Sequence, residues 1–413
     1  MSFTYDNANR RTLLTLPNGV LVEYAYDAAS RVTAITYKQN GATVLGDLTY
    51  EYDKNGSRTK IGGSFARASI PESVNTTNYN DGNQQTTVGD KALTYDSNGN
   101  LTSITDSNGT TLYAWNPRNQ LVGITGPNVN ASFVYDGLGR RQRKIVNGNT
   151  TDFLYDGVNP IQEGSGATIV ANILPGLTLD EVFARTDVTS GTTSSFLSDG
   201  LGSSLALTDA SGAVQTEYTY KPFGKTTMTG ASNTSSLQFT GRENDASGLY
   251  FYRARYYHPD LQRFISEDSM GVIDGFNIYA YVGNNPTNRV DPTGKWAIAI
   301  PAVYGLGELI YVGSAALAGY LLSKTVGTLS PEQQAEKDAE YKEYKKRCRE
   351  SPPSGLDKCA DAKWRLQRNI DCLQMREAWD RKWNPGAHDD EIDSVRRSIK
   401  NAQDDVNRYC RCP

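Results

Sequence analysis

The sequence predicts a mainly β protein, built as a sheet of repeated β-hairpins and ending in a small α-helical C-terminal domain. Three observations predict this fold class. A repeat recurs through the first part of the chain, apolar and polar residues alternate between its copies, and the composition changes near residue 296 to an apolar run and then a charged, cysteine-bearing tail. A chain of 413 residues has room for two or three domains. We expect four segments, at 1–198, 199–295, 296–322 and 323–413.

The composition excludes some classes of protein. Hydrophobic residues make up 38% of the chain and charged residues 21%, with a formal net charge of −4, which is typical of an ordered protein and not of a general nucleic-acid binder. Neither 1–322 nor 323–413 carries a large excess of basic side chains, so there is no clear nucleic-acid signal. The N-terminal sequence MSFTYDNANRR lacks an apolar run behind a basic head, so we expect no classical signal peptide.

The repeat unit is a Tyr-Asp pair, a turn and a run of alternating residues. Its aspartates fall at positions 6, 27, 53, 96, 136 and 156, with a degenerate copy at Asn116. Turn sequences such as Asp-Gly and Asn-Gly tolerate positive φ, and the alternation that follows gives strands with one buried face. Because one hairpin cannot bury its own face, neighbouring repeats should stack into a long, curling sheet. Periodicity alone leaves a generic β-solenoid or β-propeller open.

Three segments carry a resemblance to a known family. They are DGLGSSLALTDASGAVQTEYTYKPFGK at 199–225, FTGRENDASGLYFYRARYYHPDLQRFISED at 239–268 and NIYAYVGNNPTNRVDPTGK at 277–295. Together with the Tyr-Asp units, they resemble the YD repeats and the repeat-associated core of Rhs proteins. The resemblance implies a hollow β-cocoon whose core separates the carrier from a variable C-terminal toxin. This chain has fewer repeats than a full cocoon, so we expect a partial shell.

A doubled motif lies just before the change of composition. Asp268-Ser-Met-Gly-Val is followed, after eighteen residues, by Asp291-Pro-Thr-Gly-Lys. It resembles the doubled Asp-Pro-x-Gly-Leu motif of Rhs proteins, although Ser269 replaces a proline. The resemblance implies that Asp268 and Asp291 form a catalytic dyad that cuts after Lys295, before Trp296. Two close carboxylates do not both ionise readily, so one would keep a proton while the other activates water. The alternative is that both aspartates only cap turns.

Three further polar residues lie in the aromatic stretch before this motif. His258 is one of two histidines in the chain, and we expect it to be packed or solvated and not a catalytic base. Arg255 and Arg263 flank it and could pair with a dyad carboxylate. Arginine in a polar repeat is usually solvated surface, so neither is predicted to be catalytic.

The segment 296–322 is apolar and carries one charged residue, Glu308. A helix of about 20 apolar residues can cross a bilayer, so this segment is a candidate membrane segment. Pro301 and the carboxylate of Glu308 argue against spanning. The alternative is a hydrophobic hairpin packed inside the cocoon.

The tail is predicted to hold three helices. The helical stretches are 332–349, about 356–382 and about 388–410, and apolar residues recur at helical spacing in the second and third. His388 begins the third helix beside four carboxylates, those of Asp389, Asp390, Glu391 and Asp393, and is a candidate metal ligand or general base. Acidic residues in a first helical turn also complement the helix dipole, so a purely structural interpretation stays open.

Five cysteines lie in this tail and in no other part of the chain. Antiparallel helices would bring Cys348, Cys359, Cys410 and Cys412 to one end. We expect two disulfides among these four, with a four-thiolate zinc site as the alternative. Cys372 would then be a buried, unpaired side chain.

These features lead to two functional hypotheses. The first is the C-terminal part of an Rhs-type polymorphic toxin, in which a self-cleaving aspartyl core releases a short effector used in competition between bacteria. Its expected partners are a cognate immunity protein, a secretion machinery that delivers it to a neighbouring cell, and a target-cell membrane reached through 296–322. No cofactor is expected, apart from zinc as the alternative at the cysteines. The second is an uncut YD-repeat surface protein that binds carbohydrate or a neighbouring cell, with a membrane-proximal helix.

Overall fold

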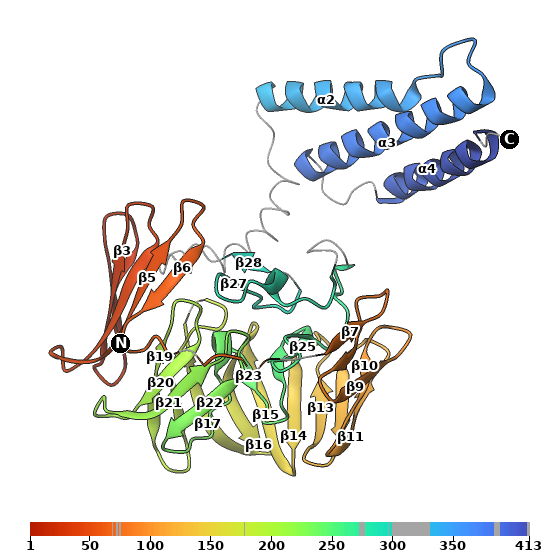
Figure 1. Cartoon of the computed structure of the whole chain (residues 1–413). Coiled ribbons are helices and arrows are strands. Elements are labelled where there is room, and N and C mark those ends of the chain that lie inside the picture. Colours follow the sequence, from red (N-terminus) through yellow and green to blue (C-terminus); the bar gives the residue numbers. More distant parts are fainter. Residues whose placement is uncertain are drawn as a thin grey trace. The chain divides into compact units, whose positions relative to one another are not determined.

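The computed structural model describes residues 1–67, 69–71, 73, 76–176, 178–271, 277–295, 297–299, 331–383 and 389–410. Within them the predicted fold class is confirmed, because antiparallel sheets are followed by a group of three helices (Figure 1). The chain forms two compact units, Met1–Tyr311 and Val312–Pro413.

The first six strands form one meandering sheet, in which each strand pairs antiparallel with the next along the chain. Sequential pairing is what tight turns between alternating strands produce. The strands are β1 (Ser2–Tyr5), β2 (Arg11–Thr15), β3 (Leu21–Tyr26), β4 (Val32–Gln39), β5 (Thr43–Tyr52) and β6 (Arg58–Gly62).

The Tyr-Asp pair has a physical role in each hairpin. The carboxylate of Asp27 accepts hydrogen bonds from the backbone N–H groups of Ala29 and Arg31, both at 2.9 Å, which closes the turn. Tyr26 donates its hydroxyl to the carbonyl of Arg11 on the neighbouring strand at 2.7 Å. In each repeat, therefore, the aspartate stabilises its own turn and the tyrosine binds the preceding strand. The same bonds recur at Tyr52 and Asp53 and at Tyr135 and Asp136.

Sixteen further strands form a second antiparallel sheet, again in sequential order. Its members β19 and β20 pair across residue 198, so the predicted boundary at that residue falls inside a continuous sheet. The strands are β7 (Thr77–Tyr79), β8 (Gln85–Val88), β9 (Lys91–Tyr95), β10 (Leu101–Asp106), β11 (Gly109–Trp115), β12 (Leu121–Thr125), β13 (Asn130–Tyr135), β14 (Arg141–Val146), β15 (Asn149–Asp156), β16 (Asn159–Ser165), β17 (Thr168–Pro175), β18 (Val182–Asp187), β19 (Thr193–Ser198), β20 (Ser204–Thr208), β21 (Val214–Tyr220) and β22 (Thr226–Gly230).

The two large sheets share a hydrophobic core. One buried cluster contains Ile35 and Tyr37 of the first sheet together with Phe183 and Leu197 of the second. The hydroxyl of Tyr37 also donates to the carbonyl of Ser198 at 2.6 Å. The first unit therefore closes by packing repeats that are far apart in the sequence.

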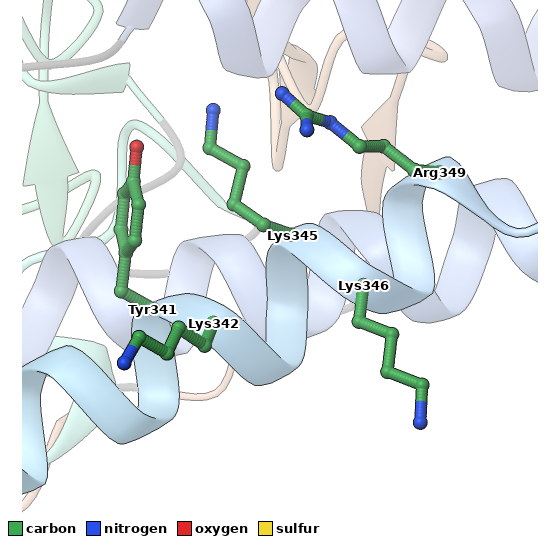
Figure 2. Close-up of a pocket in the computed structure, with 5 residues that line it drawn as sticks. All are labelled: Tyr341, Lys342, Lys345, Lys346 and Arg349. Carbon is green, nitrogen blue, oxygen red and sulfur yellow. The ribbon is translucent and has the colours of Figure 1, made fainter.

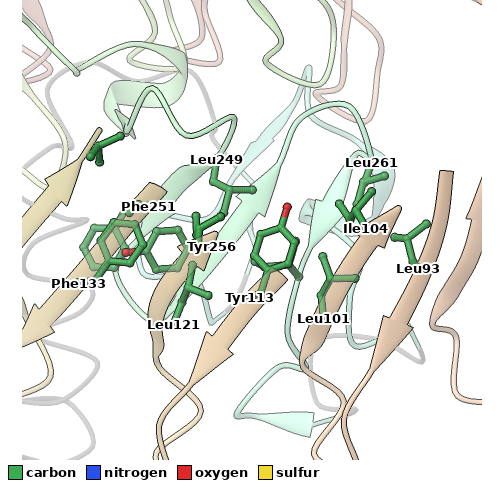
Figure 3. Close-up of a cluster of buried hydrophobic side chains, with 14 of the residues drawn as sticks. Leu93, Leu101, Ile104, Tyr113, Leu121, Phe133, Leu249, Phe251, Tyr256 and Leu261 are labelled. Atoms are coloured by element: carbon green, nitrogen blue, oxygen red, sulfur yellow. The ribbon is translucent and has the colours of Figure 1, made fainter. Parts of the chain in front are cut away.

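A small core sheet covers the apolar face of the larger sheet. Leu249, Phe251 and Tyr256 of this region pack with Leu121 and Phe133 of the larger sheet in a second buried cluster (Figure 3). The short elements of this region are η1 (Phe239–Gly241), β23 (Glu243–Asn244), β24 (Tyr250–Tyr252), β25 (Arg255–His258), β26 (Arg263–Phe264), η3 (Val282–Asn284), β27 (Arg289–Val290) and β28 (Ile298–Ala299).

A buried ionic network links the core sheet to the larger sheet. Arg141 of β14 has no exposed surface and donates hydrogen bonds to the carboxylates of Glu243 and Asp245. It also donates to the hydroxyl of Tyr256 at 3.2 Å. Burial alone would lower the pKa of Arg141, but the two carboxylates raise it well above its ordinary value. The guanidinium therefore stays charged inside the protein.

The second unit contains α2 (Pro331–Arg349), α3 (Lys358–Trp383) and α4 (Asp389–Tyr409). These bounds agree with the predicted helices to within one or two residues. Trp379 of α3 packs against the rings of Tyr341 and Tyr344 of α2. Its indole N–H donates to the carbonyl of Lys337 at 3.1 Å, which fixes α3 alongside α2.

The disulfide pairing differs from the prediction. Cys348 is bonded to Cys372, and Cys359 is bonded to Cys410. The prediction that Cys372 is unpaired was therefore wrong, and Cys412 lies outside the described residues. The linker between α2 and α3 extends beyond the end of α2, so α3 begins beyond that end. Cys348, near the end of α2, therefore lies beside Cys372 in the middle of α3. Four bonded sulfurs cannot act as zinc thiolates, and the described residues hold no group of three metal-ligating side chains.

Two predicted features lie outside the described part of the chain. They are His388 and, apart from 297–299, the apolar segment 296–322. None of the described helices combines the length and the apolar composition needed to cross a membrane.

Candidate self-cleavage site

Asp268 and Asp291 each begin a tight turn in the core region, and both are buried. The Asp268 carboxylate accepts a hydrogen bond from the N–H of Met270 at 2.8 Å. The Asp291 carboxylate accepts one from the N–H of Lys295 at 3.1 Å. Both aspartates therefore cap turns, as the structural alternative predicted. The same two carboxylates also bind one arginine, Arg255.

The two carboxylates converge on Arg255 of β25. Its Nη2 lies 2.7 Å from Oδ2 of Asp268 and 3.2 Å from Oδ2 of Asp291. One nitrogen therefore binds an oxygen of each carboxylate. The side chain of Arg255 is only 4% exposed. The prediction that Arg255 is solvated surface was wrong. The alternative, that Arg255 pairs with a dyad carboxylate, is what the structure shows.

Other contacts fix the orientation of Arg255. Its guanidinium lies 3.7 Å from the centre of the Phe264 ring, and its Nη1 donates to the carbonyl of Ile278 at 3.2 Å. Its Nε donates to the carbonyl of Gly294. The Gly294–Lys295 peptide is therefore held at both ends, because Arg255 binds its carbonyl and Asp291 binds its N–H.

Gly294 is required by this geometry. Its φ is +69°, and a Cβ at this position would lie 2.1 Å from the carbonyl oxygen of Tyr252, far closer than atoms can approach. The turn is thus pressed against the hairpin of β24 and β25. Beyond it, β28 pairs antiparallel with β27, so the predicted cut after Lys295 lies in the connection between two paired strands.

The electrostatics differ from those of two carboxylates alone. A guanidinium between two carboxylates compensates part of their charge. The surroundings are otherwise aromatic, with Tyr252, Tyr257, Phe264 and Tyr281 in one buried cluster. Burial, together with the nearby carboxylates, raises the pKa of Tyr281 well above its ordinary value, so its hydroxyl stays neutral. Water attacking a peptide here would have a carboxylate as base and a fixed cation beside it.

Two other residues singled out in the sequence lie apart from this cluster. Arg263 is 6% exposed and donates to the carbonyl of Asn83 at 2.8 Å, so the prediction that it is solvated was also wrong. His258 is packed in the core region, as predicted. Burial lowers the pKa of His258 to about 4, so its imidazole is neutral near pH 7.

The second unit offers a different candidate surface, a basic hollow on α2 (Figure 2). It has a volume of about 320 Å³. Its lining residues are Tyr341, Lys342, Lys345, Lys346 and Arg349. The net charge of the whole tail is close to zero, so it gives no indication of this local concentration of basic side chains.

The sequential Tyr-Asp hairpins, the core sheet packed against them and the doubled aspartate motif define an Rhs-type YD-repeat shell protein. Residues 1–287 match the model of the teneurin YD-shell family, and the chain belongs to this family.

Several relatives are toxins by name. The chain is 29% identical over 319 residues to the tRNA3(Ser)-specific nuclease WapA of Bacillus spizizenii, covering 71% of this chain and 12% of that protein. It is 38% identical over 91 residues to toxin subunit YenC2 of Yersinia entomophaga, covering 21% of this chain and 9% of that one. It is 36% identical over 109 residues to toxin protein Tse5 of Pseudomonas aeruginosa, covering 26% and 8%. The chain thus spans a small fraction of these relatives.

A solved structure shows the same fold. The crystal structure of TcdB2-TccC3-Cdc42 superimposes with a TM-score of 0.54 at 23% identity, covering 71% of this chain and 19% of that chain. Identity at this level shows the likeness of fold alone.

Proposed function

We propose that this chain is part of a polymorphic toxin that cuts itself after Lys295 and so separates a YD-repeat shell from a C-terminal effector. The observation that carries the proposal is the convergence of Asp268 and Asp291 on Arg255 beside the held Gly294–Lys295 peptide. Two of the relatives described above, YenC2 and Tse5, are named as toxins, which supports the same function.

The proposed reaction is hydrolysis of the bond between Lys295 and Trp296. A carboxylate of the pair takes a proton from water, and the oxygen attacks the carbonyl carbon of Lys295. The C–N bond breaks, the carboxyl group that took the proton passes it to the nitrogen of Trp296, and the oxygen stays on Lys295 as part of a new carboxylate. Arg255 stabilises the negative charge of the pair and orients the turn.

The test is a denaturing gel and an intact mass of the purified full chain. The wild-type chain should yield a fragment that begins at Trp296, whereas Asp268→Asn and Asp291→Asn should stay intact and folded. Asp260→Asn is the matched control, because Asp260 forms an exposed ion pair with Lys225 in the same region. A folded wild-type chain that stays uncut on long incubation would exclude the proposal and favour the uncut surface protein.

The effector is assigned to the tail after the cut. A delivered toxin needs a secretion machinery and, in the producing cell, a cognate immunity protein, and we propose both as partners. Expression of 296–413 in a bacterial host should slow growth, while the same segment with both disulfides removed by Cys→Ser substitution should not. Equal growth of both strains and an empty-vector strain, in cytoplasm and in periplasm, would contradict the effector assignment.

A further inference from the structure

Arg253 connects the cleavage turn to the shell. It lies at the tip of the hairpin between β24 and β25, with a φ of 56°. Its guanidinium donates to the carbonyl of Pro292, the residue after Asp291. The same group lies 2.7 Å from a carboxylate oxygen of Asp180, in the loop between β17 and β18. One side chain thus binds the turn that would be cut and a loop far away in the sequence.

The loop that contains Asp180 also contacts the first sheet. Glu181, its next residue, pairs at 2.6 Å with Arg11 of β2. Arg242 of the core region binds Asp180 as well, with both partners largely buried. The loop therefore contacts the first sheet through Glu181 and the core region through Asp180.

We propose that Arg253 is a positioning residue that makes cleavage depend on closure of the shell. This inference rests on the self-cleavage proposed above. Without Asp180, Arg253 loses its carboxylate partner. It keeps longer hydrogen bonds to Oδ1 of Asn159 at 3.2 Å and to the carbonyl of Val158 at 3.4 Å, so it holds the carbonyl of Pro292 less firmly. A displacement of a reacting group by about 1 Å can cost up to about 10²-fold in rate. A chain whose loop is undocked should therefore fold its core region and still be cut slowly.

The rate of cleavage measures this coupling. Cell-free synthesis of the full chain, with a short radioactive pulse and a chase, gives the rate on a denaturing gel. Arg253→Gln and Asp180→Asn should each cut about 10- to 100-fold more slowly than wild type. Arg253→Lys should be intermediate, because an ammonium is a point charge that cannot reach both partners in the same way. Arg143→Gln, which breaks an exposed ion pair on the shell, should cut normally.

A positioning role predicts more than a loss of rate. The pH dependence of the residual cleavage should be unchanged, because the groups that titrate in the reaction are still present. Asp180→Asn removes the carboxylate that Arg242 and Arg253 share, so it should also lower the midpoint of thermal unfolding, and the rates are compared at a temperature at which every variant is fully folded. If Asp180→Asn and Arg253→Gln are folded and cut at the wild-type rate, the coupling is wrong. If the wild-type chain itself is never cut, the proposed function fails instead.

A separate observation concerns the basic hollow on α2 (Figure 2). Its cations are spaced three, one and three residues apart, which places them on one face of the helix. Among the described residues, none of these four side chains forms an ion pair with a carboxylate, although Arg347 on the same helix pairs with Asp371. The cations of the hollow are Lys342, Lys345, Lys346 and Arg349.

From this surface we infer a binding site for the phosphate backbone of single-stranded nucleic acid. Lysines are depleted in the cores of protein–protein interfaces, whereas nucleic-acid interfaces are polar and strongly basic. Cations one turn apart, about 5.4 Å along the helix, can follow successive phosphates. Tyr341 at one end is 39% exposed, but its ring packs against Tyr344 and Trp379, so the contacts expected here are those of the cations with phosphates.

Binding of a labelled single-stranded RNA to the purified full chain tests this site. Replacing Lys342, Lys345, Lys346 and Arg349 by Gln should weaken binding at least about tenfold at about 50 mM salt. It should also reduce the slope of log affinity against log salt by about 3, the value expected for four phosphate contacts. The control replaces four exposed cations of α3 and α4 by Gln and should change little: Lys363, Arg397, Lys400 and Arg408.

Three results would overturn the assignment. They are no binding by the wild-type chain, equal binding by both variants, and displacement of the RNA by poly-glutamate as effectively as by unlabelled RNA. The last result would mean that the surface takes an acidic protein and not a nucleic acid.

Discussion

Asp268 and Asp291 bind the same nitrogen of Arg255, at 2.7 and 3.2 Å, although each belongs to a different turn. This shared guanidinium is what distinguishes the site from two carboxylates alone. The arginine compensates a buried charge and also holds the turn next to the predicted cut, so its removal should affect both stability and cleavage.

Arg255→Gln should abolish cleavage and destabilise the first unit. Two buried carboxylates would lose their cation, and breaking a buried ion pair in this way costs about 3–5 kcal/mol. Denaturant unfolding at neutral pH measures this loss. The triple variant Arg255→Gln, Asp268→Asn, Asp291→Asn should recover most of it, since no uncompensated charge remains. A single variant as stable as wild type would show that the three side chains do not form a charged cluster.

Arg141→Gln should destabilise the first unit without changing the chemistry of the cut. Arg141 is fully buried between Glu243 and Asp245, so we expect a loss of about 3–5 kcal/mol in unfolding free energy. Arg143→Gln is the matched control from the same strand. Its side chain is 45% exposed, and loss of its ion pair with Asp152 should cost at most about 1 kcal/mol. Similar losses in both variants would contradict the role given to burial.

Peptide mapping under non-reducing conditions should find Cys348 joined to Cys372 and Cys359 joined to Cys410. Cys372→Ser should leave Cys348 open to alkylation and lower the stability of the helical unit by about 2–5 kcal/mol, as followed by helical circular dichroism. Cys412→Ser should change neither bond. A Cys412 bonded to any of the other four would overturn this pairing.

Stability of the first unit should fall between about pH 6.5 and pH 4 partly because of His258. The ordinary pKa of His258 is 6.5, and in the folded chain it is lowered to about 4. Burial is the main cause, Asp260 opposes it, and the charges of Lys91 and Lys225 add to it. Between about pH 4 and pH 6.5 the unfolded chain therefore binds more protons than the folded chain, so the free energy of unfolding rises with pH. Above about pH 6.5 His258 is neutral in both states, and its effect on stability no longer changes with pH. His258→Gln should flatten this part of the stability curve. An unchanged curve would show that the imidazole titrates normally.

Much of the fold was predictable from local patterns. The Tyr-Asp unit carries its own turn bonds, so Asp27 and its counterparts specify hairpins without help from distant residues. Helical spacing in the tail likewise placed α2, α3 and α4 to within one or two residues. The doubled motif identified Asp268 and Asp291 as a pair, through a resemblance that is independent of the three-dimensional structure.

The pairing of the cysteines and the burial of the arginines could not be predicted in this way. Cys372 bonds Cys348 because the linker between α2 and α3 shifts one helix along the other, and no periodicity records such a shift. Arg141, Arg255 and Arg263 look like surface residues in a polar repeat. They are buried because the core sheet folds back against the strands.

The sequence by itself therefore determined the hairpins and the helices, since these depend on residues close together in the chain, and the resemblance to Rhs proteins pointed to the candidate dyad. Only the tertiary structure decided that Arg255 joins the two aspartates, and that Arg253 links their turn to Asp180. The physical reason is that a buried charge must find its partner in space. That partner is supplied by whichever distant strand or loop the folded first unit brings beside it.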